Sequence, residues 1–288
     1  MRNKQEILEL ILRFAREHDD VRAVVMNGSR ANPNTREDPF QDYDVVYLVR
    51  DVEPYKRKPD IPRYFGDILI LQLPDDMVDP PPAPDGWYTY LMQFQDGVRI
   101  DLGFQSVDNV RKCVSDSLTL VLLDKDNLIG ELPPPSERSY LPAPPTAKAF
   151  DDCCNEFWWC NPYVAKGLWR EELTYARYML DTVLREELMK MLTWYVGTGT
   201  GFKKSAGKLG KHLRDLLAAD LWALLERTYA DADPGHTWDA LFAMDDLFRR
   251  VAHEVARAFD FHYPEQDDVN VSAYIRRIRN LPGDAKTI

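Results

Sequence analysis

Only four cysteines occur among the 288 residues, and they do not form a metal-binding motif. Cys153 and Cys154 are adjacent, Cys160 follows in the same predicted helix, and Cys113 is distant. Zinc sites need closely spaced Cys or Cys and His ligands, such as a CxxC pair, and the sequence has no such spacing. The sequence therefore disfavours a zinc site and predicts buried, reduced thiols.

Long apolar runs are missing as well. No segment reaches the roughly 18 consecutive apolar residues that a membrane span needs. The N-terminal stretch does not resemble a signal peptide, because its apolar residues recur at helical spacing and are interrupted by Glu9, Arg13 and Arg16. We therefore expect a cytoplasmic protein that has no membrane partner.

Basic residues are outnumbered by acidic ones. The chain has 36 Lys and Arg against 47 Asp and Glu, which gives a formal net charge of −11. Nucleic-acid binding usually needs a basic face, so we expect no nucleic-acid partner. An acidic cleft concentrates cations and favours a cationic ligand. Nothing in the sequence indicates an obligate protein partner.

The first 110 residues or so have the pattern of a mixed sheet with a few helices. Residues 4–18 carry apolar residues on one helical face. Segments 21–26 and 43–49 are short and apolar, and the second is rich in β-branched and aromatic residues, which is typical of strands. A third candidate strand lies within 64–73, and the proline-rich segment 74–86 is a predicted loop. Two further strands are expected on either side of Asp96-Gly97, a favoured hairpin turn.

A proline-rich stretch separates this part from a helical one. Residues Glu131 to Pro145 include six prolines, which is typical of an extended connector. A helix follows, and we expect it to stop at Asn161-Pro162, with Asn161 capping a new helix that begins at Pro162. The sequence thus predicts an α+β protein with a catalytic domain over 1–132, a linker over 133–145 and a helical substrate-binding domain over 146–288. Further helices are expected in the segments 163–197, 213–230 and 237–259.

Three aspartates occupy strand positions that suit a metal site. Asp42 and Asp44 are two residues apart at the start of a strand, so both side chains point to one face. Their charges repel unless a cation neutralises them, and Mg²⁺ prefers such hard oxygen ligands and bridges them to substrate phosphates. Asp101 lies within the second strand of the hairpin. If that strand is next to 43–49, Asp101 completes the cluster used in two-metal phosphoryl transfer.

Gly28-Ser29 ends the strand before these aspartates. Gly28 allows the backbone to turn sharply and to approach a ligand closely. The amides and the hydroxyl there can bind phosphate oxygens, and Arg30 adds positive charge. The plain alternative is a simple turn at Gly28-Ser29, with Asp42 and Asp44 capping a strand in solvent.

Together, NGSR, QDYDVVYLV and a lone Asp on a later strand resemble the signature of the polymerase-β-like nucleotidyltransferases. The segments FQDYD, LLDKD, FDDCCNEFWW and MLTWYVG, in this order, are similar to the aminoglycoside 6-adenylyltransferases over about residues 1 to 265, and the last twenty residues carry no recognisable pattern. The resemblance implies Mg²⁺ as cofactor, with two ions expected, and ATP-dependent transfer of AMP to the 6-hydroxyl of streptomycin.

Two groups on the later helices are candidate binding residues. Asp152, Asn155, Glu156 and Trp159 share one helical face. That face is either a solvated stripe or a partner for the guanidinium groups of streptomycin, for which carboxylates are natural bidentate partners. Lys166 and Arg170 are four residues apart on what we expect to be the next helix. They either bind nucleotide phosphates or are surface charges, and the resemblance favours phosphates.

Other interpretations stay open at this point. The segment Gly197 to Lys211 superficially resembles a phosphate-binding P-loop, but Gly207-Lys208 is followed by Leu209 instead of Ser or Thr. It is predicted to be an interhelical loop. A transferase acting on another small molecule or on a macromolecule, and a non-catalytic nucleotide-binding regulator, are the alternatives to the antibiotic-modifying enzyme.

Overall fold

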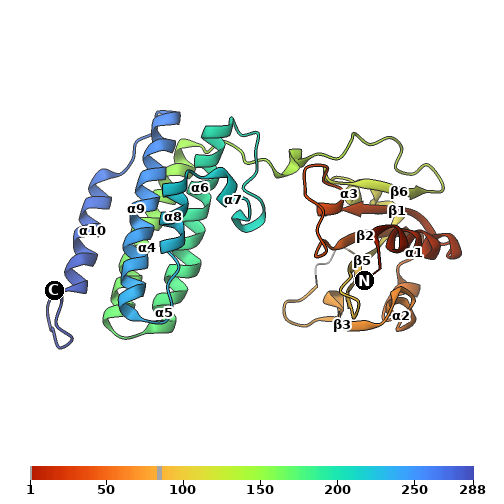
Figure 1. The fold of residues 1–288 in the computed structure, drawn as a ribbon, viewed down its shortest axis with the longest axis horizontal. Coiled ribbons are helices and arrows are strands. Elements are labelled where there is room, and N and C mark those ends of the chain that lie inside the picture. Colours follow the sequence, from red (N-terminus) through yellow and green to blue (C-terminus); the bar gives the residue numbers. More distant parts are fainter. Residues whose placement is uncertain (1, 83–85) are drawn as a thin grey trace. The chain divides into compact units, whose positions relative to one another are not determined.

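The computed structural model describes residues 2–82 and 86–288 of the chain. The chain divides into two compact units, Met1–Ser139 and Tyr140–Ile288, and each is described by itself (Figure 1). Within the described ranges, all strands belong to the first unit and the second unit is helical, which confirms the α+β class. No helix in this part of the chain is long and apolar enough to cross a membrane.

The first unit is built on a six-stranded mixed sheet in the order β3-β4-β5-β2-β1-β6. Its strands are β1 Val21–Asn27, β2 Tyr43–Val49, β3 Ile68–Gln72, β4 Tyr88–Phe94, β5 Arg99–Ser106 and β6 Leu120–Asp124. β2 and β5 run parallel, and the other neighbouring pairs are antiparallel. The strands expected at 21–26 and 43–49 and the hairpin at Asp96-Gly97 are confirmed, whereas β6 was not predicted. Residues 83–85 of the predicted 74–86 loop lie outside the described residues.

The two faces of this sheet are covered differently. Helices α1 (Lys4–Glu17) and α2 (Asp60–Phe65) pack on one face, where Tyr47 and Phe104 belong to the same core as the buried side of α1. Val46 and Leu48 point to the opposite face, with the short helix α3 (Val110–Cys113). Because side chains alternate along a strand, the even-numbered residues of β2 lie on the α3 side.

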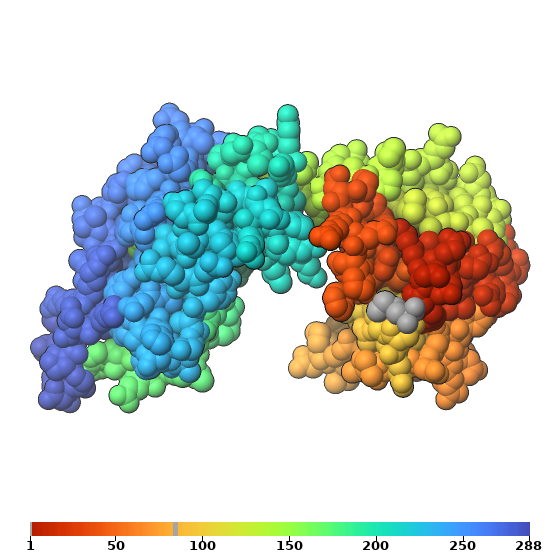
Figure 2. All heavy atoms as spheres, in the orientation of Figure 1, coloured from red at the N-terminus to blue at the C-terminus, as the bar shows by residue number. Residues whose placement is uncertain are grey.

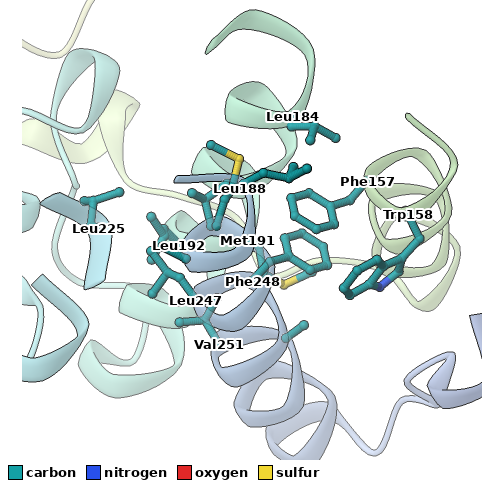
Figure 3. Packing of buried hydrophobic residues seen from close by; sticks show 14 of the residues in the cluster. Phe157, Trp158, Leu184, Leu188, Met191, Leu192, Leu225, Leu247, Phe248 and Val251 are labelled. Carbon is teal, nitrogen blue, oxygen red and sulfur yellow. The ribbon is translucent and has the colours of Figure 1, made fainter. Parts of the chain in front are cut away.

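The second unit is a bundle of helices around one core. Its elements are α4 Ala147–Trp169, α5 Leu173–Tyr178, a π-helical segment Met179–Leu184, α6 Arg185–Thr200, α7 Leu213–Leu216, α8 Ala219–Arg227, α9 Pro234–Phe259 and α10 Glu265–Arg279. At the centre, Phe157 of α4 stacks on Phe248 of α9 with ring centroids 3.7 Å apart (Figure 3). α10 packs along α4 and leaves most of its side chains on the surface (Figure 2).

The predicted helix boundary at Asn161-Pro162 is wrong. α4 runs through both residues without a break. Pro162 removes one donor to the carbonyl four residues earlier, which costs helix stability. The apolar face is buried on both sides of Pro162, at Trp158 and at Val164, and this tertiary packing outweighs the lost hydrogen bond. Asn161 is therefore a buried residue inside a helix and not a cap.

The predictions for the cysteines and for most of the helices are confirmed, whereas one helix was not predicted. All four cysteines are buried and unpaired, and burial raises the pKa of the Cys113 thiol to about 11. The predicted helix at 4–18 is confirmed as α1, and the helical segments after 213 appear as α7, α8 and α9. α10 was not predicted, because its buried side is narrow and includes the polar residues Asp268 and Ser272.

Asn161 forms part of a buried polar pair with Asp245 of α9. The Asn161 amide donates to Asp245 Oδ1, and Asn161 Oδ1 has no hydrogen-bond partner among the described residues. Burial raises the pKa of Asp245 to about 7, while the hydrogen bond from Asn161 and the nearby Arg249 partly offset the effect. A protonated Asp245 can donate to the vacant Asn161 oxygen, so the fold favours the neutral acid.

We expect Asp245→Asn to stabilise the protein at pH 8 by about 1–2 kcal/mol and to change little at pH 4. The folded pKa lies above the unfolded value, so the stability contributed by the neutral acid is present below about pH 4 and is lost as pH rises towards about 7. Asparagine keeps the donor at all pH values. Thermal unfolding of both proteins at pH 4 and pH 8 measures the difference.

The neighbouring Asp246 provides the control, because it is half exposed and pairs with Arg250 at 2.9 Å. Asp246→Asn should change stability by less than about 1 kcal/mol, with no gain that grows with pH. A lower unfolding temperature for Asp245→Asn at pH 8 would show that the charged carboxylate is stabilising.

Candidate active site

The sheet brings the predicted aspartates together at the start of two parallel strands. Asp44 of β2 lies directly beside Asp101 of β5 in the parallel register, and Asp42 precedes β2 by one residue. Ile100 and Leu102, which flank Asp101, point into the core beneath α1, so Asp101 faces the α3 side, as Asp42 and Asp44 do. The expectation that the Asp101 strand lies beside 43–49 is confirmed.

The position of Gly28 beside Asp44 requires a residue without a side chain. It follows β1 with φ +74°, a conformation that favours glycine. A Cβ atom on Gly28 would lie 2.3 Å from Asp44 Oδ2, far inside van der Waals contact. Asn27, the last residue of β1, is the register partner of Asp44. The missing side chain of Gly28 therefore leaves room for the Asp44 carboxylate at the end of the strand.

Ser29 and Arg30 continue from Gly28 in a single 3₁₀ turn. The Arg30 guanidinium donates to the backbone carbonyls of Gln41 at 2.7 Å and Asp42 at 3.1 Å. It also lies 3.8 Å from the ring centroid of Tyr43. In this structure Arg30 thus fixes the loop that leads into β2, and its predicted contact with a nucleotide stays a prediction.

Arg99 is a residue of this cluster that the sequence analysis missed. Its Nε and Nη2 donate to the two carboxylate oxygens of Asp101, each at 2.8 Å. Its Nε also lies 3.5 Å from Asp42 Oδ2. These partners, with Asp101 first, raise the pKa of Arg99 above its ordinary value. The signal was present, because Arg99 is two residues before Asp101 on the same strand and so shares its face.

Burial and charge act in opposite directions on Asp42. Desolvation raises its pKa, Arg99 lowers it and Asp101 raises it again, so the net shift is upward. Its side chain is 37% exposed. Asp42 therefore lies at the start of β2, where it is partly desolvated and repelled by Asp101. A cation placed there would lower the free-energy cost of its charge.

The donor chemistry of this cluster fits a divalent metal. Asp42, Asp44 and Asp101 offer the hard carboxylate oxygens that Mg²⁺ prefers, and the Arg99 guanidinium already places a cation between two of them. In the arrangement shown, no group of three or more His, Cys, Asp or Glu side chains within residues 2–82 and 86–288 lies in a geometry that could hold a metal ion. The fork of Arg99 occupies both oxygens of Asp101.

The predicted substrate-binding residues lie on one exposed side of α4. Asp152, Asn155 and Glu156 are all exposed, and Trp159 one turn later is 65% exposed. Asp152 pairs with Lys148 on the same helix, and Glu156 accepts a weak hydrogen bond from Cys160 at 3.2 Å. Of the three predicted residues, only Asn155 lines a hollow of about 490 Å³ between α4 and α10.

Lys166 and Arg170 are on this same helix, and not on a second one as predicted. Lys166 belongs to α4 and Arg170 caps its C-terminus. The Lys166 amine lies 5.7 and 5.9 Å from the ring centroids of Tyr163 and Tyr274. Both basic residues line a second hollow, of about 360 Å³, against the end of α10 and the C-terminal residues. Their role in phosphate binding stays a prediction.

Comparison with known proteins gives a consistent result over nearly the whole chain. A family model described as streptomycin adenylyltransferase matches residues 1–278, which extends the similarity beyond the range judged from the motifs. An aminoglycoside 6-adenylyltransferase from Bacillus subtilis (strain 168) is 36% identical over 270 residues, covering 93% of this chain and 95% of the relative. One of the same name from Campylobacter jejuni is 37% identical over 284 residues, covering 98% of each.

A solved structure is similar as well. The crystal structure of an aminoglycoside 6-adenyltransferase from Bacillus subtilis shares 32% identity with this chain and has a TM-score of 0.49. The similarity covers 98% of this chain and 100% of the other.

Proposed function

Because the chain belongs to the streptomycin adenylyltransferase family, we propose that it transfers AMP from ATP to the 6-hydroxyl of streptomycin and releases pyrophosphate. Membership of this family, with relatives named aminoglycoside 6-adenylyltransferase, supports adenylyl transfer to an aminoglycoside. The observation that carries the proposal is the side-by-side register of Asp44 and Asp101, with Gly28 leaving room for the Asp44 carboxylate. A simple strand cap does not need this arrangement.

In this proposal Asp42 and Asp44 would hold Mg²⁺, and Asp101 would contribute to a second ion. When bound, the metal neutralises the charge that develops on the transferred phosphate. The backbone amides at Gly28-Ser29 bind phosphate oxygens, and Arg30 keeps the loop before β2 in place through two carbonyls. Asp101 accepts the proton of the attacking hydroxyl. The hydroxyl oxygen then bonds to the α-phosphorus of ATP as the bond from that phosphorus to pyrophosphate breaks.

The helical unit supplies the acceptor site in this proposal. The exposed α4 face carries Asp152, Asn155 and Glu156 beside the ring of Trp159. Streptomycin offers planar guanidinium groups, for which a carboxylate is a natural forked partner and an aromatic ring a natural stacking surface. Lys166 and Arg170, further along α4, would bind nucleotide phosphates. We propose accordingly that the residues up to 132 form the catalytic domain and those from 146 the substrate-binding domain.

The test is an adenylyl-transfer assay with the purified chain, Mg²⁺, labelled ATP and a panel of acceptors. We expect label on streptomycin with release of pyrophosphate, and none on kanamycin, a tRNA pool or a protein lysate. Kanamycin offers amines, which act as point charges and match a carboxylate less well than a guanidinium fork does. Label on tRNA or protein would contradict the proposal.

Glu156→Gln tests the acceptor site in the same assay. Loss of one charge-assisted hydrogen bond should raise the streptomycin KM roughly tenfold and leave the ATP KM unchanged. Glu226 is also exposed but belongs to another helix, α8, so Glu226→Gln should change neither KM. Equal changes in the streptomycin KM of the two variants would show that Glu156 is not part of the acceptor site.

A further inference from the structure

The Arg99 guanidinium contacts the same carboxylate oxygens that a bound metal would need. It uses two nitrogens on the two oxygens of Asp101, at 2.8 Å each, and approaches Asp42 at 3.5 Å. A carboxylate has about four lone-pair positions, and the fork occupies one on each oxygen. A divalent cation on Asp101 would share these oxygens with a positively charged group in direct contact. The Arg99–Asp101 fork and a metal on Asp101 are therefore competing arrangements.

The position of Arg99 allows it to leave. Its side chain is 41% exposed, against 19% for Asp101, so the guanidinium lies on the solvent side of the pair. Arg99 is the first residue of β5, and its backbone is held by pairing with Gln93 of β4. A rotation of the side chain alone can move the guanidinium away from Asp101 without disturbing the sheet.

We propose that Arg99 is an internal stand-in cation, which holds Asp101 and Asp42 in the metal-free protein and releases Asp101 when the metal and nucleotide bind. The released guanidinium is then placed to pair with a phosphate oxygen, a geometry that suits its planar fork. This inference rests on the proposed function. It adds a competitor for the metal site and a phosphate ligand that the sequence motifs do not contain.

The Arg99–Asp101 pair is partly exposed, at 41% and 19%, which makes it a modest competitor for the metal. Ion pairs open to solvent contribute little to stability, and forked Arg–carboxylate pairs lie at the upper end of that range. Removal of Arg99 should therefore tighten metal binding to the nucleotide-free protein by roughly three- to tenfold, and should weaken binding of a metal–nucleotide complex by a similar factor. Opposite changes in the two affinities are the signature of a stand-in cation.

The experiment compares the wild type with Arg99→Gln and Arg99→Lys. Mn²⁺ binding to the nucleotide-free protein is followed by the electron paramagnetic resonance signal of free Mn²⁺. Binding of a non-hydrolysable ATP analogue with Mg²⁺ is followed by calorimetry. Arg99→Gln should bind Mn²⁺ more tightly and the analogue more weakly. Arg99→Lys, which keeps the charge and loses the fork, should lie between it and the wild type.

Arg22 of β1 offers a matched control. It forms the same kind of fork with Asp126, with Nε 2.6 Å from Oδ2. Arg22→Gln should leave both affinities unchanged. One outcome would overturn this inference and leave the proposed function standing. In it, the wild type binds the metal–nucleotide complex, and Arg99→Gln binds Mn²⁺ no more tightly than the wild type does. No Mn²⁺ binding by any variant, with or without nucleotide, would overturn both this inference and the metal site of the proposed function.

Discussion

Replacement of Asp44 by Asn is expected to lower adenylyl transfer roughly 1000-fold or more, because it removes a carboxylate ligand from the proposed metal site. The fold should remain intact. Asp44 is in β2, whose pairing with β1 and β5 uses the backbone, and asparagine has the same size. We expect a change in stability of less than about 1 kcal/mol, checked by thermal unfolding alongside single-turnover rates at saturating ATP.

Asp51 controls for a general effect of charge removal on this strand. It is exposed just beyond the other end of β2, and its Oδ1 accepts a hydrogen bond from the Glu53 amide at 3.0 Å. Asp51→Asn keeps that acceptor and should retain wild-type rates. Near-normal turnover of Asp44→Asn in the presence of Mg²⁺ would show that this carboxylate does not hold the catalytic metal.

The aspartate cluster could be predicted because strands follow a simple rule. Side chains alternate with a period of two, so Asp42 and Asp44 had to share a face, and the Asp96-Gly97 turn fixed where the next strands begin. Which strand lies beside β2 could not be read from the sequence, since pairing between distant segments depends on the whole sheet. The register that sets Asp44 beside Asp101 came from the structure.

Arg99 shows where the same rule was applied too narrowly. It lies two residues before Asp101, so alternation places both on one face, yet the prediction for this strand included Asp101 alone. Opposite charges at this spacing on a strand end can neutralise each other without a metal. The repulsion between Asp42 and Asp101 is relieved by a nearby cation, and in this structure that cation is the Arg99 guanidinium.

Errors in the helical unit have a different cause. Pro162 looked like a helix start because proline favours that position, but the buried side chains on both sides keep α4 continuous. Local preference was overruled by packing between helices, which one sequence does not display. As a result, Lys166 and Arg170, which were predicted on a separate helix, lie at the end of the helix that carries Glu156.

The second large effect is expected for Gly28→Ala, which should lower the transfer rate about 100-fold. The added Cβ would lie 2.3 Å from Asp44 Oδ2, so the carboxylate or the turn must shift by about an ångström. A displacement of that size at a reacting group can cost about 100-fold in rate. The φ of +74° adds a backbone cost of about 1–2 kcal/mol for alanine.

Gly130 separates these two effects, because it has φ +71° and a Cβ added there would meet no atom of the described residues within 4 Å. Gly130→Ala should therefore lose similar stability and keep its activity. Loss of activity in both variants would show that the positive φ, and not the contact with Asp44, causes the effect. A fully active Gly28→Ala would show that transfer does not require the Asp44 carboxylate to lie against Gly28. If the contact acts through Asp44, adding Gly28→Ala to Asp44→Asn should cost little further activity, because the two substitutions disable the same carboxylate.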